Sequence, residues 1–356
     1  MKMRLDKNRR RIDQIDRKVI ELLNERANAT VKIKNIKKKL KYDLYTPHRE
    51  KEIYDNVLRV NKGPLSNESV KAVYREIMSG SLSLGEAVKV AYLGPPLTFT
   101  NLAAISKFGS SIDYLECDGI GEVFSEVDKA RADYGVVPIE NSIEGAVNYT
   151  FDMFVDSDLK ICAEIYLEIT HNIMSKNKDM KKIKRIYSHP QVFPQCRRWL
   201  EKNMPRAELI EVSSTAKAAG ICAKEKNNAC IASSLAAKKY ALTILASSIE
   251  DTAHNVTRFL VIGRNSAEPT GDDKTSIMFS VKDRVGALHD ILVPFKKNML
   301  NMTKIESRPS KLKAWEYYFF VDLEGHYKDK KVKKALAELG KGCNYLKVLG
   351  SYPVGK

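Results

Sequence analysis

The sequence of 356 residues lacks the features that mark exported and membrane-spanning chains. Its longest apolar runs are far shorter than the roughly 20 residues that cross a bilayer as a helix. The N-terminus opens with Lys2, Arg4 and Lys7, where a signal peptide would continue into an apolar stretch. We therefore expect a globular protein of the cytoplasm that does not associate with a membrane.

Cysteine and histidine are also scarce, with six of each. The cysteines form no CxxC pair and the histidines show neither HxxxH nor HExxH spacing, which are common patterns of metal and redox sites. We expect reduced, mostly buried thiols, no structural metal and no cofactor.

Positive charge is abundant, with a formal net charge of +16 at pH 7. Residues 1–60 contain 18 Lys or Arg against 9 Asp or Glu, so much of the excess lies in one region. Nucleic acids, anionic membranes and small polyanionic substrates are all drawn by such a potential. No helix-turn-helix pattern or aromatic-rich basic patch favours nucleic acid, so we expect none as a partner.

The first 85 residues predict three helices. Apolar residues recur at helical spacing from Ile12 to Leu40 without Gly or Pro, which indicates one long helix. A second periodic stretch follows Pro47, and a third helix begins at Ser66 or Asn67 and ends near residue 84. Three such helices leave too thin a core for a monomer, so we expect them to need a partner.

A different pattern begins at Lys89, where short apolar strands alternate with helical stretches until about Gly263. This alternation is typical of an α/β region. Residues 265–273 form a polar, turn-rich linker, and the patterns that follow predict a small βαββαβ unit.

Two cations of the first helix lie on the face that should be buried. Arg26 follows Leu22 by four residues and Lys37 follows Ile33 by four, and the two cations are only about 20° apart around an ideal helix. Buried charge without a partner is costly, so a dianionic ligand would compensate the pair. Alternatively, each side chain extends to solvent along its aliphatic stem, and the spacing leaves both interpretations open.

With their neighbours, these cations resemble the all-helical chorismate mutases across residues 4–86. The residues that match in order and spacing are Arg9, Ile12, Ile15, Asp16, Arg26, Lys37, Arg49, Glu50 and Ser81. The resemblance implies that Arg26, Lys37 and Arg49, with Arg9 from the partner chain, bind the substrate carboxylates and ether oxygen. Glu50 and Ser81 would hold the hydroxyl side.

Two positions depart from the mutase pattern. Thr46 stands where an Asp is usual, and Gly85 stands where a Gln or Glu side chain usually binds the ether oxygen. An alternative is therefore a prephenate dehydratase with a weak or decayed mutase region that serves only dimerisation.

Five polar clusters occupy predicted loops or helix starts between residues 140 and 259. Hydroxyl residues at helix starts expose backbone N–H groups and the positive end of the helix dipole, so the five together predict an anion-binding cleft. As an ordered set, the phrases VPIENSIEGAV, SHPQ, IED and TRFLVIG resemble prephenate dehydratase across residues 88–264. The resemblance implies two α/β lobes hinged about a cleft, similar to type II periplasmic binding proteins.

The same resemblance implies that Thr257 is the essential catalytic residue, which protonates the departing ring hydroxyl while carbon dioxide leaves. Its candidate helpers are Arg258, His189 and Glu140; without the resemblance, Thr257 would be a plain strand residue. The expected substrate-binding residues are Asn141, Ser142, His189, Gln191, Ser214, Thr215, Ser233, Arg258 and Phe259.

One loop departs from the dehydratase pattern, because Leu97 replaces a glycine of the family's GPxGTF sequence. If that glycine has a positive φ or lies close to substrate, Leu97 would cost stability or crowd the cleft.

Two C-terminal segments resemble the ACT domain of this enzyme family across residues 274–353. The first runs from Asp283 and Arg284 to His289, and the second from Asn301 to Pro309. The resemblance implies a ferredoxin-like fold and phenylalanine pockets across a dimer interface. The residues implied in these pockets are Gly286, Ala287, Leu288, His289, Asn301, Glu306, Ser307, Arg308 and Pro309. Alternatively, Glu306 and Arg308 merely pair on the surface.

The sequence thus predicts a multidomain enzyme with an all-α mutase at residues 1–86, a two-lobed α/β dehydratase at 88–264 and an α+β ACT domain at 274–353. It would convert chorismate to prephenate and prephenate to phenylpyruvate, as an isomerase and a carbon–oxygen lyase of phenylalanine biosynthesis regulated by phenylalanine. A rival hypothesis is a non-catalytic amino-acid sensor.

Overall fold

The computed structural model describes residues 2–40, 42, 44–252, 254–281, 284–310 and 316–355. Asp283, from the first ACT-like segment, lies outside these residues. The chain divides into two compact units, residues 1–89 with 108–113, and residues 90–107 with 114–356. Each unit is described by itself.

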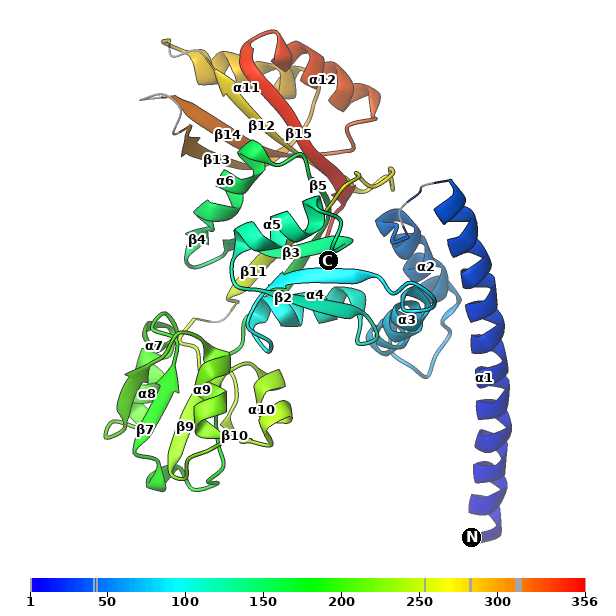
Figure 1. The fold of residues 1–356 in the computed structure, drawn as a ribbon, viewed down its shortest axis with the longest axis vertical. Coiled ribbons are helices and arrows are strands. Elements are labelled where there is room, and N and C mark those ends of the chain that lie inside the picture. Colours follow the sequence, from blue (N-terminus) through cyan, green and yellow to red (C-terminus); the bar gives the residue numbers. More distant parts are fainter. Residues whose placement is uncertain are drawn as a thin grey trace. The chain divides into compact units, whose positions relative to one another are not determined.

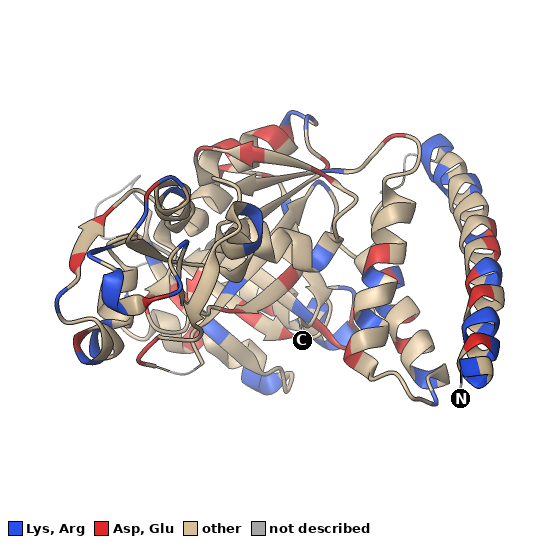
Figure 2. Cartoon of the chain, turned by 90° about the horizontal axis from the view of Figure 1, so that it is seen from below, with Lys and Arg blue, Asp and Glu red and all other residues tan. Residues whose placement is uncertain are grey.

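Three helices form most of the first unit, as predicted: α1 (Lys2–Lys39), α2 (Pro47–Val60) and α3 (Asn67–Leu82). Ser66 caps α3, since its side chain accepts a hydrogen bond from the Ser69 amide at 3.2 Å. Helix α1 (blue in Figure 1) is about 57 Å long at 1.5 Å per residue, and none of its described side chains is buried. Lysines and arginines, with acidic residues between them, occur along the helix (Figure 2).

The second unit contains two α/β lobes and a C-terminal domain. Lobe 1 has the sheet order β2-β1-β3-β11-β5, with the short β4 beside β3. Its strands are β1 (Lys89–Leu93), β2 (Asp113–Cys117), β3 (Tyr134–Asn141), β4 (Gly145–Ala146), β5 (Lys160–Glu168) and β11 (Val256–Gly263). Its helices are α4 (Phe99–Phe108), α5 (Ile120–Asp128) and α6 (Asn148–Asp156).

Lobe 2 has the sheet order β10-β6-β9-β7-β8. Its strands are β6 (Asn172–Ser175), β7 (Arg185–Ser188), β8 (Glu208–Glu211), β9 (Asn228–Ala232) and β10 (Thr243–Ala246). Its helices are α7 (Val192–Gln195), α8 (Arg197–Asn203), α9 (Thr215–Cys222) and α10 (Ser234–Tyr240). The chain enters lobe 2 after β5 and returns to lobe 1 at β11, which confirms the predicted two-lobed α/β fold.

The C-terminal domain confirms the predicted βαββαβ order. Its elements are β12 (Asp273–Val281), α11 (Ala287–Lys297), β13 (Met302–Pro309), β14 (Tyr317–Glu324), α12 (Lys330–Gly340) and β15 (Cys343–Pro353). The sheet order is β13-β14-β12-β15, the ferredoxin-like arrangement. Side chains such as Ile277 and Val321 pack with α11 and α12 on one face, whereas Met278 and Phe320 join the core of lobe 1 on the other.

Five of the six free cysteines are buried, as expected. Burial raises the pKa of Cys117 and of Cys196 to about 12, so these thiols are not nucleophiles near neutral pH. Within the described part of the chain, every helix is too short or too polar to cross a lipid bilayer.

Candidate active sites

The predicted dehydratase residues gather where strands end. In lobe 1, β1 and β3 are parallel, and β11 begins opposite the end of β3, so that Thr257 pairs with Asn141 in register. In lobe 2, β7 is parallel to both β8 and β9, and the segments that follow these strands carry His189, Ser214 and Ser233. Ligands of open α/β sheets bind at such carboxyl edges.

Thr257 and Asn141 form the centre of the lobe 1 edge. Asn141 Nδ2 donates hydrogen bonds to Thr257 Oγ1 at 2.8 Å and to Asn255 Oδ1 at 2.7 Å. The Asn141 Oδ1 accepts the amides of Ile143 and Glu144, which fixes the orientation of the side chain. Thr257 is 8% exposed. Because Thr257 Oγ1 accepts from Asn141, its own hydroxyl proton remains for donation elsewhere.

Gln195 and His171, which the sequence did not predict, extend this network into lobe 2. Asn255 Nδ2 donates to Gln195 Oε1 at 3.1 Å, and Gln195 Nε2 donates to Glu144 Oε1 at 2.7 Å. His171 Nε2 lies 2.8 Å from the same Gln195 oxygen, so the neutral ring carries its hydrogen on Nε2. Gln195 and His171 belong to no motif that the sequence singles out, and they lie 24 residues apart in the chain.

The buried His171 makes stability depend on pH. Burial lowers the pKa of His171, and the hydrogen bond with Gln195 offsets this only in part. The unfolded chain takes up a proton below about pH 6.5, where the folded chain resists it, so the free energy of unfolding should fall as the pH drops. The loss is at most about 1.4 kcal/mol per pH unit.

Urea unfolding of the wild type and of His171→Gln at pH 7.5 and 5.5 measures this effect. The wild type should lose more stability than the variant between these two values, because other titrating groups contribute equally to both. Equal losses would show that His171 accepts a proton as easily in the folded chain as in the unfolded chain.

The structure does not place Arg258 with Thr257 as the expected substrate-binding role requires. Arg258 is 6% exposed, and its guanidinium donates to Glu164 at 2.8 Å, Asp322 at 2.6 Å and the Tyr352 hydroxyl at 2.9 Å. Successive strand residues point to opposite faces, so Arg258 turns away from the Thr257 side of β11. Glu140 is likewise no helper of Thr257, because it forms an ion pair with Lys304 of β13.

Phe259 is also buried. It is 1% exposed and therefore supports β11 from within the core, so its contact with substrate stays a prediction. Ser142 stays at the edge, where its hydroxyl accepts the Val256 amide at 2.9 Å and donates to the His254 carbonyl at 3.2 Å. It thereby fixes the backbone just before Thr257.

The lobe 2 residues stand at helix starts, as predicted. Ser214 caps α9 by accepting the Lys217 amide at 3.0 Å, and Thr215 is the first residue of that helix. Gln191 precedes α7, with its amide 3.4 Å from His189 Nδ1. These helix ends present backbone N–H groups to the edge, which suits carboxylate binding.

Ser233 and Leu97 connect the lobes. Leu97 has a φ of +73°, which confirms the suspicion that this loop needs a left-handed residue. Its side chain packs into the lobe 2 core with Met174 and Tyr187. Its carbonyl accepts the Ser233 hydroxyl at 2.9 Å, and its amide donates to Asn101 Oδ1 at 3.0 Å.

In the helical unit, the side chains of Arg26 and Lys37 point toward α3 and the start of α2. Arg26 Nη1 donates to Ser81 Oγ at 2.6 Å, which joins two predicted site residues 55 positions apart. Lys37 Nζ lies 3.3 Å from Thr46 Oγ1. Both side chains are half-buried, so the alternative in which they extend freely into solvent is not seen. Glu50 is buried nearby on α2 and accepts the Tyr45 hydroxyl at 2.7 Å.

Lys34 is a third cation on this face, which the sequence reasoning missed. Its ammonium donates to the carbonyls of Leu82 at 2.6 Å and Leu84 at 2.7 Å. These carbonyls lie at the C-terminal end of α3, where a cation is favoured by the helix dipole. Glu86, beside Gly85, pairs instead with Lys38 at 2.9 Å.

Arg9 and Arg49 do not join Arg26 within this chain. Arg49 pairs with Glu52 at 2.7 Å on the surface of α2. The Arg9 side chain is 68% exposed and lies about 25 Å along α1 from Arg26, at 1.5 Å per residue. The binding of substrate by Arg9 in the site of a partner protomer stays a prediction.

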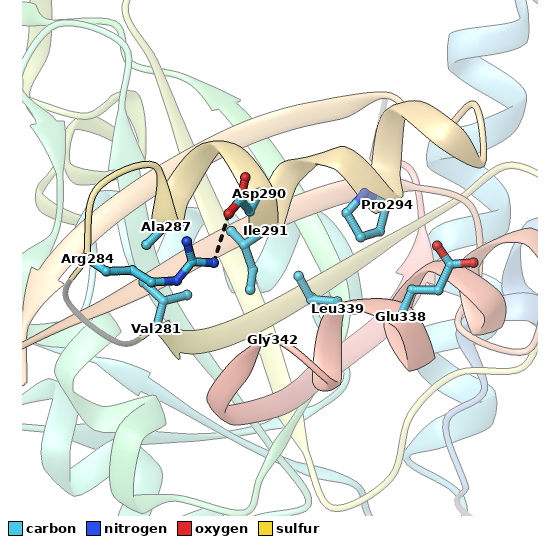
Figure 3. A pocket seen from close by; sticks show the side chains of 9 residues that line it. All are labelled: Val281, Arg284, Ala287, Asp290, Ile291, Pro294, Glu338, Leu339 and Gly342. Carbon is cyan, nitrogen blue, oxygen red and sulfur yellow. Dashed lines mark hydrogen bonds and ion pairs between the residues drawn. The ribbon is translucent and has the colours of Figure 1, made fainter.

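The C-terminal domain contains a cavity of about 110 Å³ between α11 and α12. Figure 3 shows Ala287 and Ile291 above it and Leu339 below, with Arg284 bound to Asp290 at 2.8 Å. Of the residues expected to bind phenylalanine, only Ala287 lines this cavity. The alternative in which Glu306 and Arg308 merely pair with each other is not supported, because Arg308 pairs with Asp152 of α6 at 3.4 Å.

Three family models match the chain in order. They are chorismate mutase type II at residues 8–86, prephenate dehydratase at 90–267 and the ACT domain at 275–341. A bifunctional chorismate mutase/prephenate dehydratase from Aquifex aeolicus is 51% identical over 97% of this chain and 96% of its own length. The corresponding protein of Pseudomonas aeruginosa is 45% identical, with coverage of 97% and 96%.

Among solved structures, the prephenate dehydratase of Arthrobacter aurescens in complex with L-Phe matches with a TM-score of 0.70 and 34% identity. The match covers 75% of this chain and 90% of that chain. Helical, two-lobed and ACT modules in one chain define a multifunctional biosynthetic enzyme. The chain belongs to the family of bifunctional chorismate mutase/prephenate dehydratases and carries both enzyme activities.

Proposed function

We propose that Thr257 is the acid of the dehydratase reaction and that Asn141, held by the surrounding network, orients its hydroxyl. The hydrogen bond from Asn141 Nδ2 to Thr257 Oγ1 carries this proposal, because it leaves the Thr257 proton directed away from Asn141. His189, Gln191, Ser214, Thr215 and Ser233 would bind the substrate carboxylates from lobe 2.

In this reaction, the bond from the prephenate ring to its carboxylate breaks and carbon dioxide leaves. The released electron pair completes the aromatic ring and expels the ring hydroxyl, which Thr257 protonates to water. Phenylpyruvate remains, and solvent returns the proton to Thr257. The weak acidity of a threonine suffices because aromatisation drives the departure of the hydroxyl.

We place the mutase reaction on the face of α1 that carries Arg26 and Lys37. The rearrangement of chorismate to prephenate needs no nucleophile, so catalysis comes from holding a compact substrate and stabilising the charge on its ether oxygen. Arg26, Lys37 and Arg49 would supply cations, with Glu50 and Ser81 on the hydroxyl side. Gly85 contributes no side chain, so one of these cations would serve the ether oxygen.

A two-substrate assay tests both assignments. The purified chain should convert chorismate to prephenate and prephenate to phenylpyruvate, each measured separately. Prephenate turnover without chorismate turnover would contradict the mutase assignment of residues 1–86.

We infer that two chains form a homodimer through α1. Apolar residues including Ile12, Ile15 and Leu22 are exposed along this helix in the single chain, and a second copy would cover them. The same pairing would bring the partner's Arg9 near Arg26.

Substitution of Ile15 by Asp should shift the protein from dimer to monomer in sedimentation at micromolar concentration and should lower mutase activity with it. Arg17→Asp is the control, because Arg17 lies about 200° around the helix from Ile15. A dimeric Ile15→Asp variant would place the interface elsewhere.

We further infer that L-phenylalanine binds the ACT domain and inhibits dehydration, as an effector of its own biosynthesis. The solved relative in complex with L-Phe supports this assignment. Gly286, Leu288, His289, Asn301, Ser307 and Pro309 would contribute with Ala287, Glu306 and Arg308. A cytoplasmic location also stays an inference, which the six free thiols favour.

A further inference from the structure

Strands β3 and β11 carry two cross-strand pairs at successive positions. Thr257 pairs with Asn141, and Arg258 pairs with Glu140. Successive side chains of a strand point to opposite faces of the sheet. The Thr257–Asn141 pair therefore faces the proposed active site, and the Arg258–Glu140 pair faces the ACT domain directly behind it.

A matching pair on the ACT domain holds this rear pair. Lys304 of β13 and Asp322 of β14 are themselves cross-strand partners. Lys304 Nζ lies 2.8 Å from Glu140 Oε1, and Asp322 Oδ2 lies 2.6 Å from Arg258 Nη1. Each ACT charge thus meets an opposite charge. The Arg258–Asp322 contact is shielded from water, with the two side chains 7% and 9% exposed, whereas in the Lys304–Glu140 contact Lys304 is 13% exposed and Glu140 36%.

The packing around this charge quartet is tight. A cavity of about 20 Å³ lined by Arg258, Lys304 and Asp322 is too small for a ligand and has space for about one water molecule. Arg258 also binds Glu164, which in turn binds Lys274 of β12 at 2.8 Å. Removal of Asp322 leaves the buried Arg258 without one of its partners, which is costly, and removal of Lys304 releases the partly exposed Glu140 side chain from the ACT domain.

We propose that Lys304 and Asp322 are positioning residues for prephenate dehydration. They hold the side chains of Glu140 and Arg258 in place. Because Asn141 and Thr257 are the strand neighbours of these residues, the same contacts set the geometry of the hydrogen bond between Asn141 and Thr257. The inference rests on the proposed catalytic role of Thr257. The ACT domain is then part of the dehydratase framework even without effector, and a shift of β13 reaches Thr257 through two adjacent strands.

The test uses the full-length enzyme without phenylalanine and compares Lys304→Met, Asp322→Asn and Lys304→Arg. For prephenate, kcat should fall about tenfold or more in the first two variants, because small misplacements of catalytic groups are costly. KM should stay within about twofold, since the carboxylate-binding residues are untouched. Lys304→Arg restores the charge and should recover most of kcat, and chorismate turnover should be unchanged in all three.

Lys328→Met is the matched control. It removes another ACT lysine that pairs with a residue before the domain, Glu268 at 2.6 Å, on the exposed surface. Its kcat should equal that of the wild type. A normal kcat in Lys304→Met, an equal loss in Lys328→Met, or no recovery in Lys304→Arg would each overturn the inference, even if Asp322→Asn fails to fold.

The Thr257→Ala variant separates this inference from the function on which it rests. An inactive Thr257→Ala with a normal Lys304→Met overturns the positioning role alone. A Thr257→Ala variant that keeps dehydrating prephenate overturns the catalytic assignment and with it the route from Lys304 to Thr257. Non-additive losses in Glu140→Gln combined with Lys304→Met would support the direct contact.

Discussion

Replacement of Thr257 by alanine should lower phenylpyruvate formation about 10²- to 10⁴-fold, the range of general acid catalysis. Thr257 offers the only hydroxyl proton that we assign to the departing group, and Asn141 holds its oxygen at 2.8 Å. Chorismate consumption should continue at the wild-type rate, because the mutase residues lie in a separate unit. Separate assays with chorismate and with prephenate measure the two rates.

Two further substitutions test whether the Thr257 hydroxyl itself matters. Thr257→Ser keeps the hydroxyl and should retain part of the activity, whereas Thr257→Val keeps the shape and should be as inactive as alanine. Equal activity in Thr257→Val and the wild type would exclude Thr257 as the acid. Loss of both enzyme activities in Thr257→Ala would point to a folding defect.

Replacement of Arg26 by methionine should lower mutase kcat about 10²- to 10³-fold, the loss typical of removing one group that stabilises transition-state charge. Arg26 contacts Ser81 at 2.6 Å and shares its helix face with Lys37, so methionine removes a cation from the centre of the proposed site. Prephenate dehydration should be unchanged. Continuous assay of chorismate consumption gives the rate.

The matched control is Arg59→Met, which makes the same chemical change at an exposed residue of α2 that contacts Asn56. It should leave both activities intact. If Arg26→Met keeps full mutase activity, the site does not lie on this face of α1. A monomeric Arg26→Met protein would instead indicate that the change acts through dimerisation.

Local patterns sufficed to predict the helices and the βαββαβ domain, because each relies on a periodicity within one segment. The long helix from Ile12 to Leu40 and the cap at Ser66 follow from apolar spacing and from a hydroxyl before a helical stretch. Arg26 was identified for the same reason, since a cation on an apolar face stands out in a single helix.

The site residues that the sequence assigns wrongly or misses are those whose position depends on the three-dimensional fold. Arg258 follows Thr257 directly, yet strand geometry turns the two to opposite faces. Gln195 and His171 were missed because they meet only through the crossing between the lobes. Lys34 was missed because its partners are backbone carbonyls of α3, which no side-chain pattern reveals.

The left-handed Leu97 ties lobe 1 to lobe 2 through its side chain and its carbonyl. Separation of the lobes must withdraw this side chain from the lobe 2 core and break its contact with Ser233. Exposure of a buried leucine costs about 1.5–3 kcal/mol, so the open form would be roughly ten- to a hundredfold rarer than without this side chain. Substrate capture, rather than the chemistry on the ring, would then be faster in a Leu97→Gly variant, which keeps the left-handed backbone without the buried side chain.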